Sequence, residues 1–260
     1  MSDLTYVYCL VRMASKPVLR AAPAMPGGGR VRAIAADAGL WLIVSSVPDS
    51  EYGEAALAAG LQDLDWVSRR ALAHEAVVEQ FLTASAVLPM QLFTLFTADE
   101  RALEHVARQQ AKINRILSRV QGNVEWGLRL TWDEQAARER VDQKHVRGAK
   151  RATGPTGTAY LARKRDLHDV NKKQLAGARQ AATRLFRAMS REAAAARRRT
   201  STERAAPGSR LLLDAAFLVP TRGANKFRSA LRKHSTPLEG SGIIVSLTGP
   251  WPPYNFISPP

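Results

Sequence analysis

Cysteine is almost absent from this sequence: Cys9 is the one cysteine in 260 residues. One thiol can form neither an intramolecular disulfide nor a cysteine-rich zinc site, and such low usage is typical of a reducing compartment. Long apolar runs are also missing, because the best one, residues 40–44, falls well short of the roughly 18 residues that a membrane-spanning helix needs. The first residues have no basic stretch followed by an apolar one, so no secretory signal is evident. We expect a soluble, cytoplasmic protein with no membrane partner.

The residue patterns that carry catalysis are missing as well. His74 and Glu75 begin like the metalloprotease helix motif, but Val78 stands where the second histidine is needed, so zinc could not be held there. The glycine-rich stretches, residues 27–29 and 154–157, lack the spacing and the Lys-Ser/Thr pair of a phosphate-binding loop. No Gly-x-Ser-x-Gly nucleophile elbow occurs. The sequence therefore predicts a protein that is not an enzyme and has no cofactor or metal.

Charge, in contrast, is abundant and unevenly distributed. The chain has 38 Lys and Arg against 23 Asp and Glu, a formal net charge of +15, and its hydrophobic fraction of 45% is enough to form a core. Residues 138–204 hold 19 of the basic and 6 of the acidic residues, a net charge of +13, which leaves +2 for the rest of the chain. Any electrostatic function is therefore expected in this segment.

Three interpretations of the basic segment remain open. Lys- and Arg-rich helices are most often solvated faces. Nucleic-acid binding through residues 138–204 is the alternative function, although Tyr160 and Phe186 are the only aromatic residues there that could stack on bases, so nucleic acid is not the expected partner. The third interpretation is docking to an acidic partner in an assembly. The possible partner-binding face consists of Arg163, Lys164, Arg165, Lys172, Lys173 and Arg179.

Residues 1–85 predict a small N-terminal α+β domain. Residues 6–11 and 40–47 are rich in β-branched and aromatic side chains, which is typical of strands. The stretch between them, residues 23–29, is rich in glycine and proline and predicts a loop. From residue 61 to residue 81 apolar side chains recur at helical spacing, so we expect one helix there.

Residues 86–246 predict a ferredoxin-like domain built from two successive β-α-β units. The first unit consists of strands at 87–96 and 124–130 around a helix that runs from Asp99 to Gly122, and the second consists of strands at 211–219 and 242–247 around a short helix that ends near His234.

The basic segment would then be a helical insertion, about residues 133–207, between the second and third strands of the ferredoxin-like domain. Within it, small and apolar residues recur at spacings of three and four, which predicts an amphipathic helix. The members of this stripe are Leu175, Ala178, Ala182, Leu185, Met189, Ala193 and Ala196.

The C-terminal tail, residues 247–260, is the most distinctive stretch. Five prolines occur in its last eleven residues, and Trp251, Tyr254 and Phe256 lie among them. Prolines stiffen the chain, so the aromatic side chains are presented at low entropic cost. The tail could be a free proline-rich ligand, or it could pack its aromatic side chains into a groove on its own protein or a partner. Its position directly after a core strand favours docking.

The tail sequence LTGPWPPYNF, residues 247–256, resembles the terminal signature of the gas vesicle GvpF/GvpL family. This family usually continues Leu-Pro-Met with Arg-Phe-Gly-Thr, whereas the present chain has Gln91, Leu92, Phe93 and Thr94. Further family-like stretches follow in the right order along the whole chain: YVYCLV (6–11), HEAVV (74–78), VLPM (87–90), VEWG (124–127), GTAYLARK (157–164) and AAFLV (215–219).

The resemblance implies a two-domain α+β protein whose second domain has a modified ferredoxin fold and whose tail folds back onto the N-terminal domain. It also implies a non-enzymatic, chaperone-like accessory protein of gas vesicle formation, located in the cytoplasm and on the gas vesicle as a minor component. Its implied partners are the hydrophobic shell protein GvpA and other accessory proteins. It would limit the aggregation of GvpA and aid nucleation or growth of the vesicle. We expect Trp251, Tyr254 and Phe256 to stabilise the domain arrangement, and the cleft between the domains to bind the client.

Overall fold

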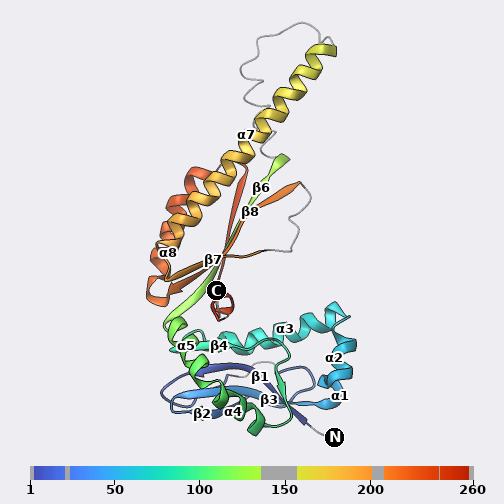
Figure 1. Ribbon diagram of the computed structural model, residues 1–260, viewed down its shortest axis with the longest axis vertical. Coiled ribbons are helices and arrows are strands. Elements are labelled where there is room, and N and C mark those ends of the chain that lie inside the picture. The colour runs from blue at the N-terminus through green and yellow to red at the C-terminus, as the bar shows by residue number, and fades with distance from the viewer. Residues whose placement is uncertain (1–2, 21–23, 136–156, 201–207, 240, 258–260) are drawn as a thin grey trace. The chain divides into compact units, whose positions relative to one another are not determined.

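The computed structural model describes residues 3–20, 24–135, 157–200, 208–239 and 241–257, with the side chains of 157–169 and 171 excepted (Figure 1). The chain forms two compact units, each with its own β-sheet, so the expected α+β class is confirmed. Unit 1 comprises Met1–Glu125 together with Pro250–Pro260, and unit 2 comprises Trp126–Gly249. Among the described residues, no helix has the length and apolar character that crossing a membrane requires.

The sheet of unit 1 has the strand order β2-β3-β1-β4, and a short strand, β5, also pairs with β1. Strand β1 is antiparallel to β3 and to β4, and Gly39, at φ +70°, makes the tight connection between β2 and β3. The strands are β1 (Asp3–Arg12), β2 (Arg32–Asp37), β3 (Leu40–Pro48), β4 (Ala86–Pro89) and β5 (Leu95–Phe96).

Helices cover this sheet and close its core. Six consecutive residues of β1, from Tyr6 to Val11, are buried, which requires cover on both faces of the strand. Helix α3 packs its Val77 and Val78 into the cluster that contains Tyr6 and Tyr8, and α4 also contacts β1 and β2. The helices of unit 1 are α1 (Asp49–Tyr52), α2 (Glu54–Gly60), α3 (Leu64–Val78), α4 (Asp99–Arg108) and α5 (Gln110–Val120), with short 3-10 helices η1 (Glu79–Phe81) and η4 (Tyr254–Phe256).

Two predicted helices of unit 1 are divided in the structure. The helical pattern of residues 61–81 belongs to α3 and η1, because the side chain of Asp63 accepts hydrogen bonds from the backbone N–H groups of Asp65 and Trp66 and so starts the helix at Leu64. The helix predicted from Asp99 to Gly122 is broken at Gln109 into α4 and α5.

The unit boundary differs from the predicted domain boundary after residue 85. Strand β4 pairs with β1, with Cys9 opposite Pro89, so the segment that was expected to open the ferredoxin-like domain completes the first sheet. Helices α4 and α5 follow it into unit 1. Periodicity indicated a strand and helical structure here, but the strand predicted at 87–96 consists of two short strands, β4 and β5. The pairing of β4 with β1 joins residues 74 to 80 positions apart, and such pairing is decided by packing and is not visible in the local pattern.

Unit 2 has the element order β-α-β-β-α-β and the strand order β7-β8-β6-β9, an order of elements typical of ferredoxin-like units. Strands β7 and β8 form an antiparallel pair. The elements are β6 (Asn123–Asp133), α7 (Gly157–Ser190), β7 (Ala195–Arg198), β8 (Ser209–Pro220), η2 (Thr221–Gly223), α8 (Ala224–Ser235), η3 (Thr236–Leu238) and β9 (Ile243–Trp251).

The basic segment has a different place in this unit from the predicted one. It was expected as an insertion between the second and third strands, but α7 is the connection between the first strand, β6, and the second, β7. The predicted apolar stripe is buried from Ala178 to Met189. The helix ends at Ser190 and not at Ala196, because the alanine- and arginine-rich residues that follow pair with β8 as strand β7. Tertiary pairing thus overrides local helix propensity here.

Candidate functional site

The C-terminal tail binds within unit 1 and forms the candidate functional site. Residues Pro250–Pro260 belong to the same compact unit as the first 125 residues. Phe256, in η4, is only 2% exposed, and Pro252 and Pro253 are buried beside it. Trp251 ends strand β9 and remains 38% exposed. Of the three predicted tail aromatics, Phe256 is therefore the apolar anchor, Tyr254 is half-buried, and Trp251 is the most exposed.

Polar contacts hold the tail at three points. The Tyr254 hydroxyl donates a hydrogen bond of 2.6 Å to Glu75 Oε2 on α3. The backbone N–H of Asn255 donates to Glu125 Oε2 over 2.8 Å, and the Asn255 side-chain amide donates to the other oxygen of the same carboxylate. Arg119 on α5 donates to the backbone carbonyl of Phe256. The contacts therefore come from α3, from α5 and from the start of β6.

Burial shifts the ionisation of the groups at this site. It raises the pKa of Glu75, and the hydrogen bond from Tyr254 opposes that rise only in part. Burial and the neighbouring Glu75 carboxylate together raise the pKa of Tyr254 well above its ordinary value. The tyrosine therefore remains a neutral donor, and its hydroxyl is well suited to satisfy a buried carboxyl group.

A second buried polar contact lies next to Glu75. The Tyr6 hydroxyl and His74 Nδ1 are 2.7 Å apart, and Tyr8 hydrogen-bonds Ser45 Oγ at 2.9 Å. Burial lowers the pKa of His74 to about 4, with a smaller opposing contribution from the Met90 backbone. This histidine is therefore neutral at pH 7, and its pKa lies far below the value that suits a general base at that pH. No group of three or more His, Cys, Asp or Glu side chains that could bind a metal occurs among the described residues.

Several of the stretches that carry the family resemblance meet at this site. Residues 6–11 form the core of β1, residues 74–78 end α3, and residues 87–90 contain most of β4, which pairs with β1. Glu125, from the VEWG stretch, binds the tail. Sequence reasoning missed Glu125, Arg119 and Asn255 as tail contacts. The one available signal was Glu125, a charged residue between the apolar residues Val124 and Trp126 of a predicted strand, which indicates a buried partner.

The turn after β4 contains residues 91–94, where the sequence departs from the usual family pattern. Phe93 occupies the position where the family usually has glycine, and its φ is +64°, in the left-handed region that favours glycine. Its ring stacks on Trp66 with centroids 5.3 Å apart. The turn is therefore present without glycine, and the aromatic contact offsets part of the backbone strain.

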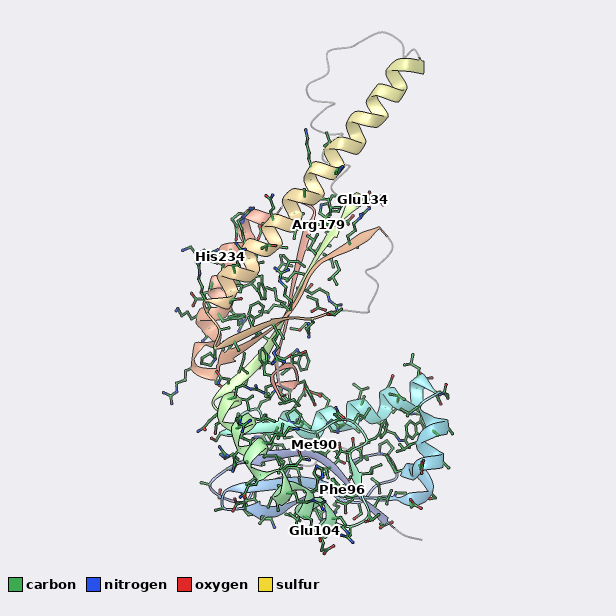
Figure 2. All side chains as sticks on the ribbon, in the orientation of Figure 1. Met90, Phe96, Glu104, Glu134, Arg179 and His234 are labelled. Carbon is green, nitrogen blue, oxygen red and sulfur yellow. The ribbon has the colours of Figure 1, made fainter. Side chains whose placement is uncertain are left out.

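The residues predicted as a basic partner-binding face lie on α7. Lys172, Lys173 and Arg179 are exposed on that helix, and Figure 2 labels Arg179 there. The side chains of Arg163, Lys164 and Arg165 lie outside the described side chains, although their backbone belongs to the same helix.

Solved structures with the same fold come from gas vesicle proteins. The crystal structure of the gas vesicle protein GvpF from Anabaena sp. PCC7120 has a TM-score of 0.69 at 13% sequence identity, covering 100% of this chain and 98% of that one. The crystal structure of GvpF from Microcystis aeruginosa has a TM-score of 0.66 at 15% identity, covering 99% of this chain and 100% of that one. At these identities the likeness concerns the fold.

Sequence comparisons give the family itself. The chain is 29% identical to gas vesicle protein L from Streptomyces sp. (strain CB03234), over 97% of this chain and 92% of that protein. It is 26% identical to gas vesicle protein L2 from Halobacterium salinarum, over 98% of this chain and 92% of that protein. None of these matches supports the nucleic-acid-binding alternative. Since the family model described as gas vesicle synthesis protein GvpL/GvpF matches residues 4–258, the chain belongs to the GvpL/GvpF family and is involved in gas vesicle formation.

Proposed function

We propose that this protein is a non-enzymatic accessory factor of gas vesicle assembly that binds the hydrophobic shell protein GvpA. In this role it limits aggregation of the shell protein, aids nucleation and growth of the vesicle, and acts in the cytoplasm and as a minor vesicle component. The observation that carries the proposal is the family match over residues 4–258. Binding of a hydrophobic client also requires exposed apolar side chains on an otherwise folded protein.

Unit 1 has such side chains on α3 and just before it. Leu64 is 78% exposed and Leu72 is 72% exposed, and they lie two turns apart on the outer side of α3. Leu61, which follows α2, is also exposed. We propose these three leucines as the client-binding surface, in place of the cleft between the domains that the sequence suggested.

Co-purification with GvpA tests this function. Tagged full-length protein is expected to retain GvpA, and the variant Leu64→Ser/Leu72→Ser is expected to retain much less. Val18→Ser is the matched control, because Val18 is an exposed apolar side chain, at 89%, elsewhere in unit 1. Absence of any association with GvpA, together with normal vesicles after deletion of the gene, would rule out the proposed role.

A further inference from the structure

The charge of the chain divides sharply between the two units. Residues 126–249 contain 26 Lys and Arg against 10 Asp and Glu, whereas residues 1–125 contain 12 against 13, and residues 250–260 contain none. Unit 2 therefore has a net charge of +16 and unit 1 a net charge of −1. The positive charge is not confined to the segment 138–204, because α8 adds to it.

In unit 2 many of the described basic side chains are exposed on α7 and α8, which contact each other, and Figure 2 labels Arg179 among them. The inner sides of these helices bury Ala178 and Leu185 on α7 and Phe227 and Leu231 on α8, so the charged residues are left in solvent. The ion pair between Lys226 and Glu192, whose Nζ and Oε2 atoms are 2.9 Å apart, uses part of this charge. The exposed members of this basic surface are Lys172, Lys173, Arg179, Arg184, Arg187, Lys226, Arg228, Arg232 and Lys233.

Unit 1 carries a surface of the opposite sign around α1, α2 and the start of α3. Residues 49–65 include five acidic residues and no Lys or Arg. All five are exposed, and Leu61 and Leu64 are exposed among them. The members of this acidic surface are Asp49, Glu51, Glu54, Asp63 and Asp65.

The acidic surface also contains a cavity of about 400 Å³. Glu51, Asp63 and Ser50 provide oxygen acceptors in its lining, and Trp66 provides an aromatic wall. Arg70 lines it too, but its guanidinium is stacked 3.7 Å from the Trp66 ring centroid and lies 3.5 Å from Glu51, so the lining keeps one net negative charge. A side chain with several N–H donors, such as arginine, fits this set of acceptors.

We propose that this protein associates head to tail, the basic surface on α7 and α8 of one copy docking on the acidic surface at α1–α3 of a second copy. The two surfaces are complementary in charge, and the aliphatic stems of the arginines and lysines would cover Leu61 and Leu64. The contact joins two different surfaces, and each copy has both of them. The contact can therefore repeat from one copy to the next and form a linear oligomer. Leu64 lies within the acidic surface and belongs to the proposed client-binding surface, so self-association would compete with client binding. The proposal of self-association does not require that the client is GvpA.

A second copy fits the basic surface better than nucleic acid does. Nucleic-acid surfaces combine basic side chains with exposed aromatic rings on which bases stack. On α7 and α8 Phe227 is buried and Phe186 is covered by the Arg198 guanidinium, 4.7 Å from its ring centroid. Among the described side chains of these helices, which do not include Tyr160, there is no exposed Phe, Trp or Tyr.

Sedimentation velocity of the full-length, nuclease-treated protein tests the proposal. At about 0.05 M NaCl the weight-average sedimentation coefficient is expected to rise with protein concentration, and at about 0.5 M NaCl it is expected to stay at the monomer value, because salt screens exposed charges. A protein that remains monomeric at both salt concentrations overturns the proposal. Association that occurs only in untreated protein, and not in nuclease-treated protein, also overturns it, because nucleic acid would then be the ligand.

Charge reversal on each surface identifies the contact. The basic-surface variant is Arg228→Glu/Arg232→Glu/Lys233→Glu, and the acidic-surface variant is Glu54→Lys/Asp65→Lys, which spares Glu51 with its Arg70 contact and Asp63 with its helix-capping role. Each variant alone is expected to be monomeric at low salt, and an equimolar mixture is expected to associate, since each variant supplies the surface that the other has lost.

A charge-matched control separates this contact from a general effect of net charge. Arg108→Glu/Lys112→Glu/Arg115→Glu changes the net charge as much as the basic-surface variant does, but at exposed positions on α4 and α5. It is expected to associate like the unmodified protein. If the mixture of the two surface variants stays monomeric, or if the control loses association equally, head-to-tail docking is wrong. Neither result bears on GvpA binding, which is measured separately.

Discussion

Phe93 shows how a single residue can contradict a local rule and still be retained by its contacts. A non-glycine residue in the left-handed region costs roughly 1–2 kcal/mol. At Phe93 this cost is offset by the stack on Trp66 and by the backbone N–H of Phe93, which lies 3.4 Å from the Tyr6 hydroxyl. The strain itself should therefore be measurable once the ring is removed.

We predict that Phe93→Gly is more stable than Phe93→Ala by about 1 kcal/mol, although glycine removes one more carbon atom. Both variants lose the stack on Trp66, but only alanine keeps the strained backbone at φ +64°. Urea unfolding measures the difference. The neighbouring pair Leu92→Gly and Leu92→Ala is the control, because Leu92 has no positive φ and alanine should be the more stable residue there. The opposite order at Phe93 would show that the turn is unstrained.

His74 predicts how the stability of unit 1 depends on pH. Its pKa is about 4 in the folded protein against 6.5 in the unfolded chain, so below pH 6.5 the unfolded state binds a proton that the folded state does not. Stability should therefore fall as the pH drops from about 6.5 to about 4, by up to roughly 3 kcal/mol, and this contribution should level off below pH 4. Glu75, whose pKa is raised, contributes with the opposite sign.

Urea unfolding at pH 7 and pH 4.5 isolates the histidine. The loss of stability between the two pH values should be about 2 kcal/mol smaller in His74→Gln than in the unmodified protein. His234→Gln, at an exposed position on α8, should leave the loss unchanged. An equal loss in both variants would mean that another group causes the acid sensitivity.

At the scale of elements, the tail is a short segment that completes a unit formed mainly by the first 125 residues of the chain. It follows β9, an element of the second sheet, but it belongs to unit 1, where Phe256 is buried and Tyr254 and Asn255 are hydrogen-bonded. Burial of one phenylalanine is worth about 3–5 kcal/mol when it is truncated to alanine.

Truncation before Pro250 should therefore lower the melting temperature by at least about 5 °C, because the buried ring and the tail's hydrogen bonds are lost together. Differential scanning calorimetry of the full-length and truncated chains measures this. A chain that ends at Ile257 is the control and should melt like the full-length protein. An unchanged melting temperature in the longer truncation would indicate that the tail is a free ligand for another protein.

Elements were easier to predict than their partners. The strand at residues 6–11, the helical patterns within α3, α4, α5 and α8, and the strands β6, β8 and β9 were all visible in periodicity, because one or both of their faces are buried. Strand β7 was not, since its Ala-Ala-Arg-Arg sequence favours helix and becomes a strand only by pairing with β8. The two β-α-β patterns were assigned to one domain, whereas the structure divides the first of them. Its first strand and its helical part lie in unit 1, and its second strand, β6, belongs to the sheet of unit 2.

At the scale of the whole molecule, the charge of +15 has a structural basis that a segment count did not reveal. It resides in unit 2, where α8 contacts α7 although 56 residues of chain separate their centres. In unit 1, the five acidic residues within the range 49–65 form a surface of negative charge. The excess of positive charge is thus confined to unit 2, whereas unit 1 is nearly neutral with a local acidic surface, and this contrast is the basis of the proposed self-association.

The sequence by itself determined the family, the α+β class, the excess of positive charge and the importance of the tail, because these depend on composition and on local patterns of side chains. The tertiary structure alone decided that β4 completes the first sheet, that α7 connects β6 to β7, and that Glu75, Glu125 and Arg119 hold the tail. Such contacts join residues up to 179 positions apart. They arise when buried polar groups must find partners, and no local pattern specifies which partner that is.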